Sequence, residues 1–373
     1  MPDSTQSSFR SRLLAWYDAN ARALPWRETD DPYRVWLSEI MLQQTRVAAV
    51  IAHYHEFLRR FPSVQKLAAA RESSVLAAWS GLGYYRRARL LHAAAKVIVR
   101  EHGGKFPENA EAWRDLPGIG RYTAAAIASI ALGEPVAVVD GNVERVLQRV
   151  AGKRLAGEGI WDAAGEFLDR SRPGDFNQAM MELGATVCAP RAPVCLMCPV
   201  VELCATRGEL NGGIKPAPQK KREIHYALIC RGEGGNRQVS LVQRPPGIPL
   251  MAGMWELPEM RTSGAKAHPQ MGGSIRSAEA LRHPKTRESQ AQTQIPYRLK
   301  PVRNHKAFGT GREGGQVLLF TVRHSITTTD YTVRVWRGTI SNNINGRWMR
   351  LKGLGRVPLT GLARKILIQA ELL

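Results

Sequence analysis

The stretch LPGIGRYTAAAIASIAL, residues 116–132, decides the fold of the first half of the chain. Gly118 and Gly120 flank one apolar residue between two helical segments, so the backbone turns there in a sharp hairpin. The second helix begins with backbone N–H groups that have no partner within the helix. Such groups hold a phosphate without reading the base sequence. A Gly-X-Gly pattern is of low specificity when it stands alone.

Asp140 follows Gly120 by twenty residues and stands where the next helix begins. Apolar residues after it have the spacing of one buried helix face: Val143, Val146, Leu147 and Val150. An aspartate directly before a helix is most often an N-cap. A phosphate-binding hairpin followed closely by a lone carboxylate favours, in addition, chemistry on a nucleic acid.

The charge balance narrows the class of partner. The 373 residues include 53 Lys and Arg against 32 Asp and Glu, which gives a net charge of +21. Such a field attracts polyanions, and ribosomal or membrane-surface proteins share it with nucleic-acid enzymes. No apolar run reaches the length of a membrane span, and the polar N-terminus lacks a signal-peptide core. We therefore expect an intracellular, cytoplasmic protein that is not embedded in a membrane.

A chain of this length predicts two domains. The apolar spacing is helical almost throughout 1–210, and a basic linker occupies 211–225. Strand-like alternation marks 226–373, within which the polar stretch 261–300 is expected to be a mobile insertion. The expected helices are 36–61, 73–79, 86–100, 123–132, 142–150 and 161–169. The expected strands are 225–230, 238–243, 317–322 and 331–337, followed by a terminal helix at 362–370.

Four of the five cysteines form one compact group: Cys188, Cys195, Cys198 and Cys204. In a reducing compartment this grouping favours metal ligation over disulfides. Four thiolates suit either tetrahedral zinc or a [4Fe–4S] cluster, and the single tight Cys-x2-Cys pair slightly favours iron–sulfur. The remaining Cys230, in a predicted strand, is expected to be a small buried residue.

One carboxylate, Glu39, lies in the apolar run VWLSEIMLQQ, residues 35–44. One interpretation places it in the first turn of a helix, where negative charge is favoured. The other places it in a pocket, where desolvation by neighbours such as Trp36 raises its pKa and lets it act as a general acid near neutral pH. With Asp140 it would then divide the roles of acid and cation stabiliser, as in glycoside hydrolysis.

Several motifs stand in a fixed order along the first half: SEIMLQQT at 38–45, GLGYY at 81–85, LPGIG at 116–120, VDGNV at 139–143 and NQAMMELG at 177–184. Together with the cysteine spacing, they resemble adenine DNA glycosylases of the MutY type, which are helix-hairpin-helix base-excision enzymes. The resemblance covers residues 9–205. It implies a mostly α helix-hairpin-helix glycosylase domain with an iron–sulfur loop, in which the four cysteines hold a [4Fe–4S] cluster.

The resemblance implies that a monomer acts on double-stranded DNA and excises adenine mispaired with 8-oxoguanine or guanine. The adenine would be flipped out of the duplex, which costs least at a mismatch. Glu39 would protonate the purine at N7 and then help to activate water. Asp140 would stabilise the sugar cation, and Asn142 would orient Asp140. The positions that match the base pocket are Trp26, Arg27 and Glu182, and those that match intercalating residues are Gln43 and Tyr84.

The position just after the hairpin discriminates among related enzymes. Relatives that also cut the strand carry a lysine there, which attacks the sugar as a Schiff-base nucleophile. Tyr122 takes that place here, and a phenol forms no imine. The chain is therefore expected to be monofunctional and to leave an abasic site.

Three other functions share some of these features. An endonuclease III-like glycosylase and lyase for damaged pyrimidines is disfavoured by Tyr122 and by the second half, which such enzymes do not need. A non-catalytic, DNA-binding or redox-sensing iron–sulfur protein would not require Glu39 and Asp140 together. A Nudix hydrolase with a DNA-binding appendage would need an acidic helix that the second half lacks.

The second half resembles a Nudix-type domain at residues 241–245 and 253–258, and the family uses such a domain to recognise 8-oxoguanine. Residues 261–285 contain a single glutamate, so the magnesium-binding helix is missing and we expect an α+β Nudix-like domain without nucleotide hydrolysis. The family's lesion-reading loop has a Phe-Ser-His core. Its three positions align with Ile326, Thr327 and Thr328, and only the hydroxyl of Thr327 is retained, so the loop departs from the pattern with which the family reads 8-oxoguanine.

Overall fold

The computed structural model describes residues 3–210, 219–248, 250–260, 312–313, 316–326, 329–338 and 346–373. Its contacts divide the chain into two compact units. The first comprises Met1–Lys215, Gln243–Glu256 and Lys352–Leu373, and the second Pro216–Val242 and Leu257–Leu351. This division differs from the boundary expected from composition, since two segments beyond the linker join the helical unit. The expected insertion at 261–300 lies outside the described residues.

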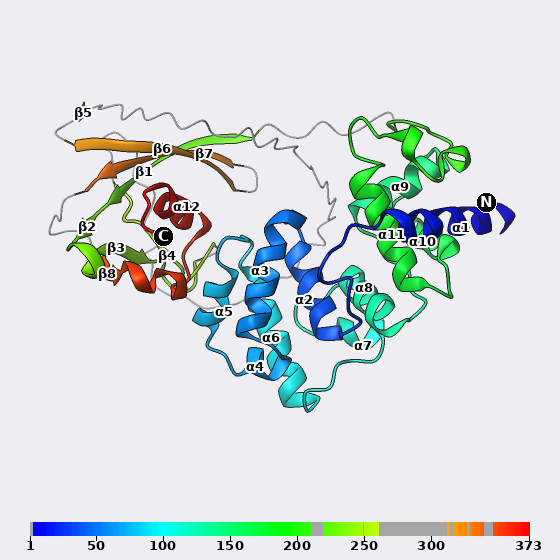
Figure 1. Cartoon of the computed structure of the whole chain (residues 1–373), viewed down its shortest axis with the longest axis horizontal. Helices are drawn as coiled ribbons and strands as arrows, with labels where there is room; N and C mark the ends of the chain where they lie inside the picture. The colour runs from blue at the N-terminus through cyan, green and yellow to red at the C-terminus, as the bar shows by residue number, and fades with distance from the viewer. Residues whose placement is uncertain are drawn as a thin grey trace, which may run out of the picture. The chain divides into compact units, whose positions relative to one another are not determined.

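The first unit is helical over most of its length, as the apolar spacing predicts (Figure 1). Its first six helices are α1 (Asp3–Asn20), α2 (Pro32–Leu42), α3 (Val47–Arg60), α4 (Val64–Ala68), α5 (Glu72–Trp79) and α6 (Arg86–Glu101). The next five are α7 (Ala110–Arg114), α8 (Arg121–Leu132), α9 (Gly141–Ala151), α10 (Glu158–Phe167) and α11 (Pro173–Thr186). Two short 3-10 turns, η1 (Cys195–Met197) and η2 (Val201–Leu203), follow in the cysteine segment.

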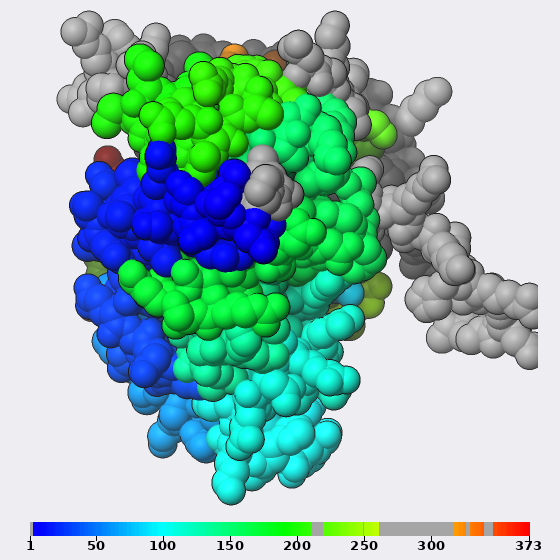
Figure 2. Space-filling view, turned by 90° about the vertical axis from the view of Figure 1, so that its right-hand side faces the viewer, coloured from blue at the N-terminus to red at the C-terminus, as the bar shows by residue number. Residues whose placement is uncertain are grey.

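Two buried apolar clusters hold these helices together. One cluster joins α2 to α8 and contains Trp36 and Trp113, whose ring centroids are 5.8 Å apart. The other joins α1 to α8–α11, where Phe9 meets Phe167 edge-on at 4.8 Å. Figure 2 shows α1 in blue, with green surface from later segments of the same unit on both sides of it. Such aromatic contacts add to the free energy gained by burying apolar area.

The single helix expected over 36–61 is instead two helices, α2 and α3. The apolar spacing continues across the break, so periodicity alone does not reveal it. The break coincides with Gln44, whose φ of 54° lies in the left-handed region that few non-glycine residues adopt. Glu39 therefore lies two turns into α2, which excludes a first-turn position for it.

The predicted hairpin connects α7 to α8. Gly118 adopts a φ of +79°, and a Cβ built on it would lie 2.6 Å from Cβ of Leu90. Glycine is thus required twice over at this position, for backbone conformation and for space. Gly120 is the N-cap residue of α8 and has extended backbone.

The C-terminal part of the first unit contains β4 (Trp255–Glu256), η4 (Leu351–Arg356) and α12 (Gly361–Gln369). Met254 is fully buried in the cluster that contains Trp36. The carbonyl of Leu359 accepts hydrogen bonds from Ser80 Oγ at 2.9 Å and from Tyr85 Oη at 3.1 Å, and both bonds are buried. The chain segment near the C-terminus is therefore part of the helical core.

The second unit is built of strands. Its larger sheet has the order β1-β7-β6-β5, formed by β1 (Lys220–Leu228), β5 (Arg312–Glu313), β6 (Gln316–Ile326) and β7 (Thr329–Arg337). Three further strands pair antiparallel, namely β2 (Cys230–Arg231), β3 (Gln238–Gln243) and β8 (Arg347–Arg350), and a short η3 (Gly234–Asn236) joins β2 to β3. In the described parts of the chain, no helix has the length and apolarity to cross a membrane.

Residues 220–225, which composition assigns to the linker, are the first part of β1. This basic segment pairs in parallel with β7, from Lys220 opposite Thr329 to His225 opposite Arg334. The pairing supplies backbone hydrogen bonds that override the unfavourable run of exposed positive charge. The linker residues before Gln219 lie outside the described ranges.

Candidate functional site

Glu39 is buried in the interior of the first unit, with 6% of its surface exposed. Burial raises its pKa to about 7, because the ionised form loses its hydration. A hydrogen bond from Tyr122 and the nearby Arg27 oppose this rise, while the charge of Asp140 adds to it. Glu39 is therefore a carboxyl group that exchanges a proton near neutral pH.

Asp140 is the N-cap residue of α9, and its side chain is held by three hydrogen bonds. Oδ1 accepts from the backbone N–H of Asn142 at 2.9 Å and from that of Val143 at 2.8 Å. Oδ2 accepts from Nδ2 of Asn142 at 2.8 Å. Burial raises the pKa of Asp140, and the three donors oppose it by favouring the carboxylate. The side chain thus caps a helix and presents a fixed carboxylate at once.

Tyr122, in the first turn of α8, lies between these groups. Its hydroxyl donates to Oε2 of Glu39 at 2.8 Å and lies 3.3 Å from Sδ of Met181. Burial and the charges of Glu39 and Asp140 raise the pKa of Tyr122 well above its ordinary value, so the phenol stays neutral. The bond to Glu39 is not foreshadowed by sequence spacing, because it joins residues 83 positions apart.

Arg145 supports Asn142 from the second turn of α9. Its Nη2 donates to Oδ1 of Asn142 at 2.8 Å and to the carbonyl of Gly184 at 2.7 Å. Its Nε donates to the carbonyl of Cys188 at 2.8 Å. Sequence analysis did not identify Arg145. Arg145 follows Asn142 by three residues on one helix, and that spacing alone predicts that the two side chains can meet.

Glu182 is the centre of a second charged group, with 1% of its surface exposed. Arg22 donates to both of its carboxylate oxygens at 2.6 Å, and Arg27 donates to Oε2 at 2.9 Å. Burial alone would raise the pKa of Glu182, but the two arginines outweigh it and lower the pKa. Trp26, the residue before Arg27, is buried and meets Tyr54 edge-on at 5.4 Å. Arg22 was not identified from the sequence, where nothing separates it from other surface arginines.

The four cysteines of the sequence group line one pocket, although no set of three His, Cys, Asp or Glu within the described ranges is arranged around a single metal ion. Two of the sulfurs accept hydrogen bonds. Arg149 Nη1 donates to Sγ of Cys188 at 3.2 Å, and the backbone N–H of Arg207 donates to Sγ of Cys204 at 3.4 Å. Burial and the neighbouring thiols raise the pKa of Cys198 to about 11. Thiols around one pocket with N–H donors to sulfur form a donor set that fits an iron–sulfur cluster.

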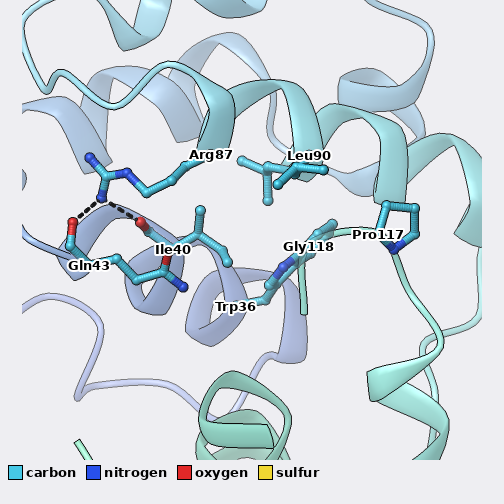
Figure 3. A pocket seen from close by; sticks show the side chains of 8 residues that line it. Trp36, Ile40, Gln43, Arg87, Leu90, Pro117 and Gly118 are labelled. Carbon is cyan, nitrogen blue, oxygen red and sulfur yellow. Dashed lines mark hydrogen bonds between the residues drawn. The ribbon is translucent and has the colours of Figure 1, made fainter. Parts of the chain in front are cut away.

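The two expected intercalating residues have different exposures. Gln43 is the C-cap residue of α2, and its Nε2 donates to Oγ1 of Thr123 at 3.2 Å. It lines a small cavity together with Gly118 and Arg87 (Figure 3). Tyr84 is 48% exposed and has a φ of 47°. The structure thus brings Gln43 together with the hairpin.

The expected lesion-reading residues fall at the end of β6. Ile326 is the last residue of that strand and pairs with Thr329. Thr327 lies outside the described residues, as does the side chain of Ile326. The assignment of this loop stays a prediction. Cys230, expected to be buried, is half-buried in β2.

Comparison with known proteins places the site in context. A family model described as HhH-GPD superfamily base excision DNA repair protein matches residues 37–155. The adenine DNA glycosylase of Mus musculus is 40% identical over 322 residues, which are 70% of this chain and 62% of that protein. That of Schizosaccharomyces pombe is 40% identical over 316 residues, 67% of this chain and 68% of that protein.

The chain thus spans about three fifths of the length of its mouse relative. Among solved structures, a thermostable thymine-DNA glycosylase matches with a TM-score of 0.52 and 31% identity. The match covers 55% of this chain and 97% of that one. The helical fold of the first unit is therefore that of a helix-hairpin-helix glycosylase.

Proposed function

Because the chain belongs to the adenine DNA glycosylase family, we propose that it hydrolyses the N-glycosidic bond of adenine mispaired with 8-oxoguanine or guanine in duplex DNA. The observation that carries this proposal is a pair of carboxyl groups in unlike environments. Glu39 has a pKa of about 7 and one hydrogen-bond donor, whereas Asp140 has three. A carboxyl group with one hydrogen-bond donor beside a carboxyl group with three suits a reaction that needs an acid and an anion together.

Glu39 acts first as the acid. Its proton passes to N7 of the flipped adenine, and the electron pair of the bond between C1′ and N9 leaves with the base. Adenine therefore departs as a neutral molecule. Tyr122 holds the carboxyl by its hydrogen bond to Oε2, which leaves Oε1 available for the base.

Asp140 stabilises the sugar cation that remains. The transition state carries positive charge on the sugar ring, as in glycoside hydrolysis. A carboxylate already fixed by three donors does not need to reorganise when that charge develops. Glu39, now ionised, accepts a proton from the water that attacks C1′, and an abasic site is left.

Tyr122 determines where the reaction stops. Strand cleavage through a Schiff base requires an amine at the sugar carbon, and the phenol supplies none. The hydroxyl is also engaged with Glu39. The enzyme is therefore monofunctional in this proposal and releases a duplex whose backbone is intact.

The adenine itself is received by Trp26, Arg27 and Glu182. A carboxylate held by two arginines is a fixed acceptor, suited to the exocyclic amino group of adenine. Trp26 provides an apolar face beside it. Gln43 and Tyr84 enter the base stack, while Gly118 and Gly120 hold the backbone of the DNA.

Cys188, Cys195, Cys198 and Cys204 would hold a [4Fe–4S] cluster. Bound there, the cluster supplies a redox-active centre and a covalent tie across the segment 188–204. Arg149 and the backbone N–H of Arg207 donate to the sulfurs of Cys188 and Cys204, which would be two of its ligands. Residues 226–373 act as the Nudix-like domain that reads the opposite 8-oxoguanine, with Ile326 and Thr327 in the reading loop.

A single-turnover assay tests the proposal. Duplexes that contain adenine opposite 8-oxoguanine are incubated with the protein and analysed with and without alkali. Cleavage that appears only after alkali supports base removal without lyase activity. Cleavage without alkali would favour the endonuclease III-like alternative, and no cleavage would refute both. In a parallel assay Glu39→Gln should bind the duplex yet release no adenine, and full activity of that variant would refute its role as the acid.

A further inference from the structure

Arg87, on α6, joins the two segments that carry Gln43 and Tyr84. Its Nη1 donates to the carbonyls of Ile40 at 2.8 Å and Met41 at 2.9 Å, and also to that of Gln43. These carbonyls are the unsatisfied end of α2. Figure 3 shows Arg87 reaching across the cavity to Gln43 and Ile40, with Gly118 on the hairpin side.

The same guanidinium holds the loop on the other side. Nη2 of Arg87 donates there to the carbonyls of Gly83 at 3.3 Å and Leu82 at 3.4 Å, and it also donates to Oγ1 of Thr45, on the Gln43 segment, at 2.9 Å. Its Cζ lies 5.5 Å from the centroid of the Tyr84 ring, which adds a cation–π contact. One planar group thus contacts both the segment of Gln43 and the loop of Tyr84, which are about 40 residues apart in sequence.

Both segments contain a strained residue. Gln44 has a φ of 54° and Tyr84 a φ of 47°. For residues other than glycine this conformation is unfavourable, and it persists only where the surroundings hold it. The carbonyl oxygens that face Arg87 would repel one another if no cation lay between them. Burial lowers the pKa of Arg87 to about 10, which leaves it charged at neutral pH.

From these contacts the geometry points to Arg87 as a positioning residue that sets Gln43 and Tyr84 at a fixed spacing, so that both enter the base stack together. The inference rests on the proposed function, because it takes Gln43 and Tyr84 as the intercalating residues. Arg87 itself does not touch the reacting atoms. It acts on the step before chemistry, when the adenine leaves the stack.

Arg87→Lys is the sharpest variant. Lysine keeps the positive charge at the end of α2, but its single ammonium does not span both segments as a planar guanidinium does. Arg89→Lys is the matched control, since Arg89 lies on the same helix and donates to Glu72 at 2.9 Å and to the carbonyl of Ala252. Thr45→Val provides a second route, because it removes one acceptor of Arg87 and leaves the arginine in place.

Fluorescence measures the positioning step directly. A duplex carries 2-aminopurine beside an adenine opposite 8-oxoguanine, and the probe brightens when its neighbour is unstacked. We expect Arg87→Lys to reduce the rise in fluorescence on binding by at least about half, Thr45→Val to reduce it less, and Arg89→Lys to leave it unchanged. A rise equal to that of the parent protein in both Arg87→Lys and Thr45→Val would overturn the inference.

Excision rates separate positioning from a loss of structure. On a duplex whose base pairs on both sides of the adenine are normal, Arg87→Lys should lower the single-turnover rate of excision by about 10-fold or more. On a duplex in which mismatches flank the adenine on both sides, the stack is already open, and the loss should shrink to about 2-fold. Equal losses on the two duplexes would mean general damage to the fold and would contradict the inference. If the parent protein unstacks the probe but releases no adenine, the proposed function fails while the fluorescence comparison still decides the role of Arg87.

Discussion

Glu39 is a carboxyl group that its surroundings keep partly protonated at neutral pH, and this carries a cost in stability. Its pKa is about 7 in the folded chain and near 4.5 in the unfolded chain. Below pH 4.5 both states are protonated and the cost is absent. As the pH rises from 4.5 to 7 the unfolded chain releases its proton first, so the free energy of unfolding falls by about 3 kcal/mol.

Glu39→Gln removes this titration while it keeps an oxygen that accepts from Tyr122. We expect the variant to be more stable than the parent by up to about 3 kcal/mol at pH 8 and of equal stability at pH 4.5. Denaturant unfolding at the two pH values measures the difference. A gain of the same size at both pH values would show that the ionisation of Glu39 is not its cause.

Asp140→Asn separates the two roles of that residue. Asparagine still caps the helix through its single oxygen, but its Nδ2 would face the donor Nδ2 of Asn142, so we expect a modest fall in the melting temperature. It carries no charge to stabilise the sugar cation, so the excision rate should fall by about 100-fold or more. Thermal unfolding and single-turnover assays on the same preparation measure both. If the excision rate falls only as far as the loss of folded protein accounts for, Asp140 serves as a helix cap and not as a stabiliser of the cation.

At the scale of helices, the close approach of α11 to the start of α9 determines the geometry around Asp140. A Cβ added at Gly184 would lie 2.5 Å from Cβ of Asn142. Gly184→Ala should therefore displace Asn142, cost about 1–3 kcal/mol and lower the excision rate. Gly165→Ala in α10 is the control, since nothing lies within 4 Å of its added Cβ. That change should leave activity intact and raise stability slightly.

The sequence predicts the positions of the helices better than it predicts the residues that complete the site. Apolar spacing predicts most helices of the first unit, because each buries one face. It does not predict the break after Leu42, because Gln44 is held in its conformation by Arg87 from another helix. Glu39 and Asp140 stand out as lone carboxylates in apolar or pre-helical positions. The sequence does not single out Arg22, Arg87 and Arg145, because the partners of these side chains are mostly backbone carbonyls or side chains distant in sequence.

Over the whole molecule, the net charge of +21 is the feature that we expect to govern the proposed association with DNA. Each phosphate that a lysine or arginine neutralises releases counterions, so affinity falls with salt. We expect binding to the mismatched duplex to weaken by about 10³-fold or more between 50 and 200 mM KCl if six or more phosphates are contacted. Fluorescence anisotropy over a salt series measures the slope. A nearly flat series would mean that the basic residues do not face the DNA.

The hydrogen bonds from Ser80 and Tyr85 to Leu359 have a consequence for folding during synthesis. The two partners of the Tyr85 bond are 274 residues apart, so the ribosome must add that many residues after Tyr85 before the bond can form. At about 5–20 residues per second this takes roughly 14 to 55 s. During that time the hydroxyls of Ser80 and Tyr85, which flank the segment around Tyr84, lack the carbonyl of Leu359 as their acceptor. A chain that stops short of Leu359 would keep its helices but lack the acceptor of both hydroxyls, so we expect the segment around Tyr84 to gain its full set of hydrogen bonds only after residue 359 is made.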